Sequence, residues 1–163
     1  MNKKNAMVKR LSLFLTLLLL GTIMLAGCQS QKEVDVDPAA LADALKEAVT
    51  FQDEMTQTEE AVYIRIYGTA ADTIESARVY MSTGATAEEI AVFKAKTAED
   101  AAAIYSLMEK RIENQKQAFE DYVPAEMAKL SDPVLKKEGK LVILCVSDEN
   151  DKAQAKIDDM LKK

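Results

Sequence analysis

The chain of 163 residues carries 21 basic and 27 acidic side chains, a formal net charge of −6, and has no histidine. Its length fits one domain that buries a hydrophobic core without disulfide bonds. Ser-His-Asp catalysis, Cys-His catalysis and the usual zinc sites all require imidazole, so the sequence excludes these classes. The acidic balance also argues against a nucleic-acid partner.

The N-terminal segment has the pattern of a secretory signal peptide. Residues 1–10 contain four basic side chains and no acidic one, and an apolar stretch of ten residues, 11–20, follows. This stretch is shorter than the roughly 20 apolar residues of a membrane-spanning helix. The sequence Leu-Ala-Gly-Cys at 25–28 then resembles the lipobox of bacterial lipoproteins. A chance match at the end of an uncleaved anchor helix is the alternative.

The lipobox resemblance implies that Cys28 receives a diacylglycerol and becomes the new N-terminus after cleavage. We therefore expect a signal peptide at 1–27, the lipidated Cys28 with a flexible tether at 28–37, and a single domain at 38–163. The expected location is the extracytoplasmic face of the cell membrane, and two acyl chains suffice for stable attachment. Cleavage would leave 136 residues with 17 basic and 27 acidic side chains, a formal charge of −10.

Local signals predict two helices at the start of the domain. Asp37 and Pro38 form an N-cap followed by proline at the first helical position, which predicts a helix over about 38–49. Thr56 and Glu59 have capping-box spacing, and Gly68 provides a stop signal for a second helix.

Two segments carry conflicting signals. Within 61–67 the apolar residues alternate as in a strand, yet the flanking caps favour a helix, and we favour the helix. Residues 74–81 alternate as a strand, and a turn at 82–85 leads to a second apolar segment at 89–95. Thr86 and Glu89 form a rival capping box that would make 89–95 helical; we favour the strand.

The remainder of the chain predicts one long helix, a hairpin and a terminal helix. A stripe of apolar residues from Ala101 to Tyr122 at three- and four-residue steps predicts a helix that opens at Thr97 and stops at Pro124. A shorter helix is expected at 125–130, a strand from 134, a turn at 138–140, a buried strand at 141–146 and a helix at 148–163 with Asp148 as its N-cap. These elements predict an α+β fold, an antiparallel sheet of about four strands packed by the long amphipathic helix, with shorter N- and C-terminal helices.

Three parts of the sequence together resemble a known family. They are Glu-Ile-Ala-Val-Phe-Lys at 89–94, the set Arg111, Gln115, Phe119, Tyr122 and Pro124, and Gly-Lys-Leu-Val-Ile at 139–143. The chain from about Pro38 onward is similar to small bacterial lipoproteins, mainly of Gram-positive anaerobes, that are classed as a domain of unknown function. The resemblance implies a lipid-anchored extracytoplasmic domain and transfers no catalytic or binding residue.

Most charged and reactive side chains have a structural interpretation. We expect Cys145, within an apolar strand, to be a buried hydrophobe rather than a reactive thiol. The adjacent acidic pairs, Glu88-Glu89 among them, are expected on the solvated surface or at helix starts. Residues 148–153 lack the oxygen ligand and glycine that a calcium loop requires, so no calcium site is predicted there. With no histidine and no glycine-rich phosphate loop in the sequence, neither a metal nor a cofactor is predicted.

Arg111, Gln115 and Tyr122 are the candidate binding patch. Gln115 interrupts the apolar stripe of the long helix, and Arg111 lies one turn before it. The alternative is structural: Gln115 satisfies a backbone group at the edge of the core, and Tyr122 keeps its hydroxyl at the surface.

Two function classes are compatible with these features. We favour a non-catalytic binding or accessory module at the cell envelope, whose partner is an envelope protein or a small ligand. The alternative is an envelope hydrolase that uses two distant carboxylates.

Overall fold

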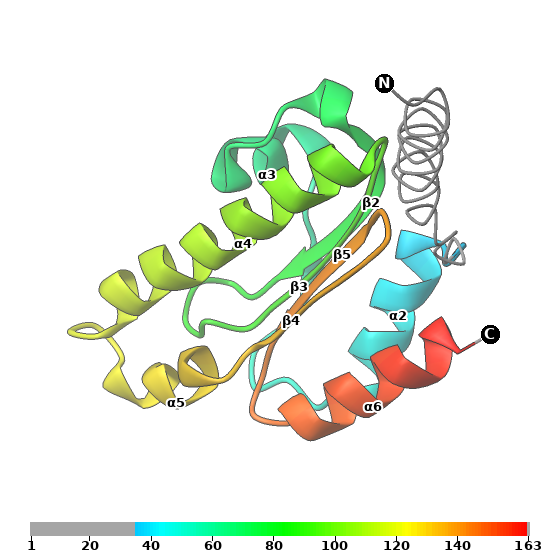
Figure 1. Cartoon of the computed structure of the whole chain (residues 1–163). Helices are drawn as coiled ribbons and strands as arrows, with labels where there is room; N and C mark the ends of the chain where they lie inside the picture. Colours follow the sequence, from blue (N-terminus) through cyan, green and yellow to red (C-terminus); the bar gives the residue numbers. More distant parts are fainter. Residues whose placement is uncertain (1–34, 163) are drawn as a thin grey trace, which may run out of the picture. The chain divides into compact units, whose positions relative to one another are not determined.

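The computed structural model describes residues 35–162, which belong to one compact unit spanning 33–163. The predicted signal peptide, Cys28 and most of the tether lie outside the described residues. Figure 1 shows a sheet with helices on both of its sides. Within the described part of the chain, no helix has both the length and the apolar character needed to cross a membrane.

The domain contains five α-helices and five strands in the described residues. The helices are α2 (Pro38–Ala48), α3 (Glu60–Tyr67), α4 (Ala98–Phe119), α5 (Met127–Ser131) and α6 (Asn150–Leu161), with 3₁₀ turns η2 (Ala71–Thr73) and η3 (Pro124–Glu126). The strands are β1 (Thr56–Gln57), β2 (Ile74–Met81), β3 (Glu89–Ala95), β4 (Val134–Glu138) and β5 (Leu141–Val146).

The strands form one antiparallel sheet in the order β1-β2-β3-β5-β4, which confirms the predicted α+β class. The sheet has five strands rather than about four. The additional strand, β1, consists of two residues that pair with Met81 and Tyr80 of β2. A strand of two residues has no detectable periodicity, so the sequence could not reveal it.

Helices cover both faces of the sheet and create two hydrophobic clusters. On one face Ala91 and Phe93 of β3 pack in the cluster that includes residues of α3 and α4. On the other face Ile90 and Val92 pack in the cluster that includes residues of α2 and α6. Because both of its faces are covered, β3 reads as a continuous apolar run instead of an alternating one. The prediction of packing by the long helix therefore describes only one face.

Several local signals act as predicted. The Asp37 carboxylate accepts a hydrogen bond from the Ala39 amide at 3.2 Å and starts α2. The Thr97 hydroxyl accepts a hydrogen bond from the Asp100 amide at 3.0 Å and starts α4. Residues 60–67 are helical, and Gly68 ends α3 with a left-handed φ of 70°.

Two predicted caps are wrong. Thr56 lies in β1, and the N-cap residue of α3, Glu59, makes no side-chain capping bond. The strand favoured at 89–95 is confirmed over the rival capping box of Thr86 and Glu89, because Glu89 begins β3. The N-cap of α6 is Glu149 rather than Asp148.

Cys145 is completely buried, as predicted, and its thiol is free. Burial raises the pKa of this thiol to about 12. The side chain therefore remains a protonated, unreactive part of the core at neutral pH.

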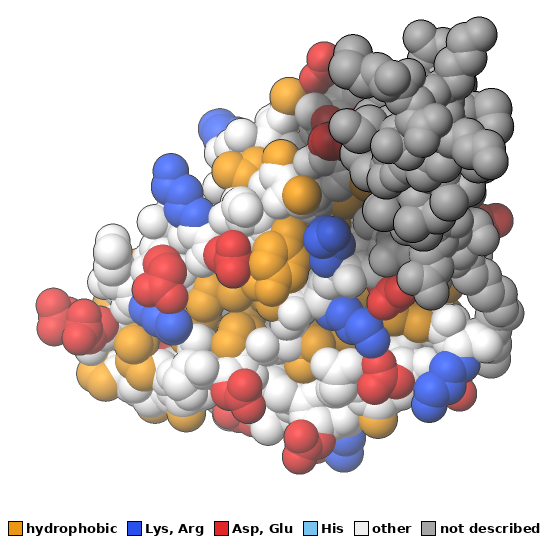
Figure 2. All heavy atoms as spheres, viewed as in Figure 1, with side chains coloured by type: hydrophobic (Ala, Val, Ile, Leu, Met, Phe, Trp, Pro, Cys, Tyr) orange, Lys and Arg blue, Asp and Glu red, His pale blue; other side chains and the backbone are white. Residues whose placement is uncertain are grey.

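The two ends of the sheet carry different features. Near the end of β3, Lys94 forms an ion pair with Asp35 at 3.2 Å, so the chain enters the domain at this end. At the beginning of β3, Glu89 follows the loop that connects β2 to β3. Acidic and basic side chains are interspersed with hydrophobic ones over the face shown in Figure 2.

Candidate functional site

A hollow of about 230 Å³ lies where the loop between β2 and β3 meets the second half of α4. We call it the β2–β3 pocket. Its lining combines loop hydroxyls, two glutamates, a cation, an amide and an aromatic ring. The lining residues are Met81, Ser82, Thr83, Gly84, Thr86, Glu88, Glu89, Arg111, Gln115 and Phe119.

Glu89 is the buried acid on the α4 side of this pocket. Its side chain is 1% exposed and forms an ion pair with Arg111, whose Nε and Nη2 donate to Oε2 at 3.1 and 2.9 Å. Gln115 Nε2 donates to the same oxygen at 3.2 Å, and the Tyr67 hydroxyl donates to Oε1. Donors from α3 and α4 thus compensate the buried charge at the start of β3.

The environment of Tyr67 shows the consequence of this arrangement. Burial, together with the charge of Glu89, raises the pKa of the Tyr67 hydroxyl well above its usual value. The hydroxyl therefore remains a hydrogen-bond donor to Glu89 over the physiological pH range.

The structure brings together two of the three residues singled out from the sequence. Arg111 and Gln115 line the pocket and meet at Glu89. Tyr122 does not line the pocket: it is 71% exposed, and its ring lies 6.3 Å from that of Phe119. Gln115 is bonded to a carboxylate rather than to the backbone group that the structural alternative expects.

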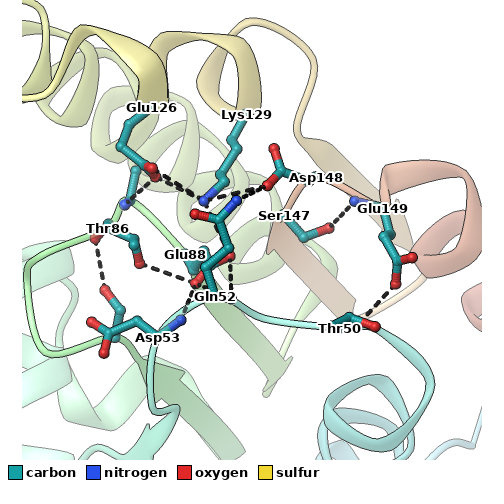
Figure 3. A network of polar contacts seen from close by, with 12 residues as sticks. Thr50, Gln52, Asp53, Thr86, Glu88, Glu126, Lys129, Ser147, Asp148 and Glu149 are labelled. Atoms are coloured by element: carbon teal, nitrogen blue, oxygen red, sulfur yellow. Dashed lines mark hydrogen bonds and ion pairs between the residues drawn. The ribbon is translucent and has the colours of Figure 1, made fainter.

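Glu88, the neighbouring acid, is buried in a second network (Figure 3). Its carboxylate accepts hydrogen bonds from the amides of Gln52 and Asp53 at 3.0 Å and from the Thr86 hydroxyl at 3.1 Å. The ammonium of Lys129 donates to Glu88 Oε1 at 3.1 Å. The network ties the segment after α2 to the beginning of β3 and to α5.

Lys129 is the centre of this second network. Its ammonium also donates to Glu126 at 3.1 Å and lies 3.6 Å from Asp148. Burial lowers the pKa of Lys129, but hydrogen bonds and charges from Glu126 and Glu88 outweigh this effect and leave the pKa above its usual value. Glu126 in turn accepts a hydrogen bond from the Ala87 amide at 2.8 Å.

The surface position expected for the Glu88-Glu89 pair is wrong, since both residues are buried. Each acid finds a cation from a helix that comes later in the chain, Lys129 on α5 and Arg111 on α4. The available sequence signal was the continuous apolar run that directly follows Glu89, because such a run indicates a strand covered on both faces. Glu88, Glu89, Glu126 and Lys129 are therefore residues that sequence reasoning missed.

A second hollow of about 450 Å³ lies on the other side of Lys129, between α5 and the start of α6. Its lining includes Asp132, Asp148, Glu149 and Asp151. Among the residues that the structure describes, no group of three or more cysteine or acidic side chains could hold a metal ion. The Asp148 carboxylate accepts a hydrogen bond from Gln52 Nε2 at 2.5 Å.

Comparisons with known proteins identify a family and no individual relative. No curated protein matches the chain, and no solved structure matches it either. One family model, described as "Domain of unknown function (DUF4358)", matches residues 47–147. The match runs from the end of α2 to just after β5, more than half of the chain, and includes Glu88, Glu89, Arg111 and Lys129. The chain therefore belongs to this family of unknown function, DUF4358.

Proposed function

We propose that this protein is a lipid-anchored extracytoplasmic module that binds a protein or a small ligand at the cell envelope without catalysing a reaction. The observation that carries the proposal is the position of the β2–β3 pocket, at the end of the sheet opposite the entry of the chain. The expected anchor, Cys28, precedes the domain by a tether at 28–37 with a reach of roughly 30 Å when extended.

The proposed orientation follows from the direction of β3. The strand has seven residues and runs from Glu89, at the pocket, to Ala95, near the Asp35–Lys94 ion pair. At roughly 3.3 Å per residue, its two ends are about 20 Å apart. A tether attached near Asp35 leaves the opposite end of the domain, with the pocket, away from the point of attachment and accessible to partners in the envelope.

The arrangement of the two glutamates supports binding over hydrolysis. General acid–base catalysis requires a carboxyl group that exchanges a proton with the substrate. Both carboxylates are instead held by cations and backbone or side-chain donors: Glu88 by Lys129 and Glu89 by Arg111. These contacts already use the oxygens of both carboxylates, which favours a structural role for the acids and a binding role for the pocket.

The anchor is tested by replacing its sulfur. We expect Cys28→Ala to abolish lipidation and signal-peptide cleavage, whereas Cys145→Ala, which changes the buried thiol, should mature normally. Intact mass spectrometry and partition into detergent report both events. Normal maturation of Cys28→Ala, or a native product that retains residues 1–27, would refute the anchor.

The binding end is tested by photo-crosslinking in living cells. A photoreactive residue at Ala85, which is exposed in the β2–β3 loop, should capture a protein or small-molecule adduct. The same residue at Glu99, which is exposed near the start of α4 at the opposite end, is the matched control. Equal capture from both positions, or capture from Glu99 alone, would contradict a binding surface at the pocket.

A further inference from the structure

The acids of the β2–β3 pocket have little capacity left for a ligand. All four carboxylate oxygens of Glu88 and Glu89 already accept hydrogen bonds from protein donors. A ligand that relied on these oxygens as its main acceptors would have to displace Lys129 or Arg111. Recognition must therefore come from the other polar groups of the lining.

Arg111 and Gln115 each retain an unused polar group. Arg111 contacts Glu89 through Nε and Nη2, and Gln115 contacts it through Nε2. Within the described residues, Arg111 Nη1 and Gln115 Oε1 form no hydrogen bond with the protein. In the same residues, every buried side-chain nitrogen or oxygen has a hydrogen-bond partner, so these two atoms are not fully buried. Both atoms are therefore accessible, and both side chains line the pocket.

The two unused groups form a donor next to an acceptor. Arg111 and Gln115 are four residues apart on α4, so they lie on the same face of the helix one turn apart. Glu89 orients both side chains through its single Oε2 atom. A ligand that complements them must offer an acceptor to the guanidinium and a donor to the amide oxygen.

The charges argue against an anionic ligand. Arg111 is paired with Glu89, and Lys129 is shared by Glu88 and Glu126, so the lining has no excess positive charge to attract a carboxylate or phosphate. Phe119, one turn after Gln115, adds an apolar wall that suits methyl groups.

From these contacts we infer that the β2–β3 pocket binds a secondary amide group, with its carbonyl on Arg111 and its N–H on Gln115. This inference rests on the proposed binding function and specifies its ligand. A volume of about 230 Å³ fits one amide with its flanking groups, and is smaller than the roughly 300–1,000 Å³ of typical drug-sized sites. Both a peptide and an acylated amino sugar present such an amide.

The experiment compares matched probes on the mature protein, purified from cells in detergent micelles, by ligand-observed NMR titration. For the peptide source, the probes are N-acetylalanine methylamide and its isosteric ester, the methyl ester of O-acetyl-lactic acid. For the sugar source, they are N-acetylglucosamine and glucose. We expect the amide of at least one pair to bind about fivefold more tightly than its partner, the value of one neutral hydrogen bond.

Each outcome decides the inference. Preference for the amide in one pair identifies the source, and preference in both pairs identifies the amide itself as the recognised group. Equal binding of amide and non-amide probes in both pairs, or binding of none of the four, overturns the inference. This comparison requires no substitution and therefore does not depend on the folding of a variant.

Two variants assign the preference to the named residues. Gln115→Met keeps the side-chain volume and removes the acceptor. The fivefold preference for amide over ester should therefore disappear, so that the two probes bind about equally. Arg111→Lys keeps the charge beside Glu89 but loses the planar donor fork, and should weaken amide binding about fivefold. Arg65→Lys, the same change at an exposed position on α3, is the control and should change nothing. An unchanged preference in Gln115→Met, with native circular dichroism, would overturn the assignment.

Failure of this inference and failure of the proposed function are distinguishable. Loss of amide selectivity leaves the lipid anchor and the crosslinking difference between Ala85 and Glu99 intact. Conversely, a purified protein that is not lipidated at Cys28 would retain the amide preference.

Discussion

The ammonium of Lys129 lies 3.1 Å from Glu88 Oε1, and these side chains are only 2% and 0% exposed. A buried ion pair of this kind contributes little net stability relative to an apolar pair, but removing one partner is costly. The pair also joins the walls of the two hollows, since Glu88 lines the β2–β3 pocket and Lys129 lines the hollow beside α6.

Replacing Lys129 should strongly destabilise the domain. We expect Lys129→Met to lower the free energy of unfolding by about 3–5 kcal/mol, because the variant leaves Glu88 and Glu126 buried without their cation. Urea denaturation measures the change. The control is Lys116→Met, which breaks an exposed ion pair with Glu113 at 2.8 Å and should cost at most about 1 kcal/mol. Equal losses in the two variants would contradict the central role of Lys129.

Two tyrosines allow a matched test of the Glu89 cluster. The rings of Tyr63 and Tyr67 both pack edge-on against Phe93, with centroids 5.4 and 5.3 Å away. Of the two hydroxyls, that of Tyr67 donates to Glu89, while that of Tyr63 has no protein partner in the described residues. Tyr67→Phe should therefore cost about 1.5–3 kcal/mol, the range for a hydrogen bond to a charged group, and Tyr63→Phe less than about 0.5 kcal/mol. Thermal and urea unfolding would show the difference, and a larger loss in Tyr63→Phe would disprove the assignment.

Cys145 predicts a loss of stability at alkaline pH. The thiol of the unfolded chain has an ordinary pKa of 9.0, whereas the folded value is about 12. Between these values the unfolded state has released a proton that the folded state retains, so stability is full below pH 9 and falls as the pH rises. The slope from this one group approaches about 1.4 kcal/mol per pH unit. Urea unfolding curves recorded between about pH 8 and 11 measure how the free energy of unfolding depends on pH, and in Cys145→Ala the contribution of the thiol should be missing. An unchanged pH dependence in this variant would contradict a contribution from Cys145.

Gly68 tests the end of α3. Its φ of 70° is left-handed, and a Cβ added there would meet no atom within 4 Å, so any loss on substitution reflects the backbone. Gly68→Ala should cost about 1–2 kcal/mol, and Gly68→Asn less, because asparagine tolerates this conformation better. Melting temperatures should therefore rank glycine above asparagine above alanine. A different order would mean that the turn relaxes to another conformation.

Many elements of this fold could be predicted from local sequence. The capping bonds of Asp37 and Thr97 act over two or three residues, and the apolar stripe of α4 repeats over its whole length. The hairpin between β4 and β5 is also marked by a turn and a buried apolar run. Such signals involve neighbouring residues, so one sequence is enough to recognise them.

Capping signals alone do not decide the outcome where a distant partner competes with them. Thr86 and Glu89 have the spacing of a capping box, but the ladder of β3 with β2 and β5 holds this segment extended. Asp148 is a residue type that favours the N-cap position, yet its carboxylate accepts a hydrogen bond from Gln52, which is 96 residues away in the chain.

The sequence by itself determined the class of fold, the main helices and strands, the burial of Cys145 and the expectation of an anchor at Cys28. Only the tertiary structure decided that Glu88 and Glu89 are buried and that Arg111 and Gln115 share one carboxylate. The physical reason is that a charged side chain can be buried only where opposite charges and donors converge on it. In this protein those partners come from α3, α4 and α5, and their convergence is a property of the packed domain.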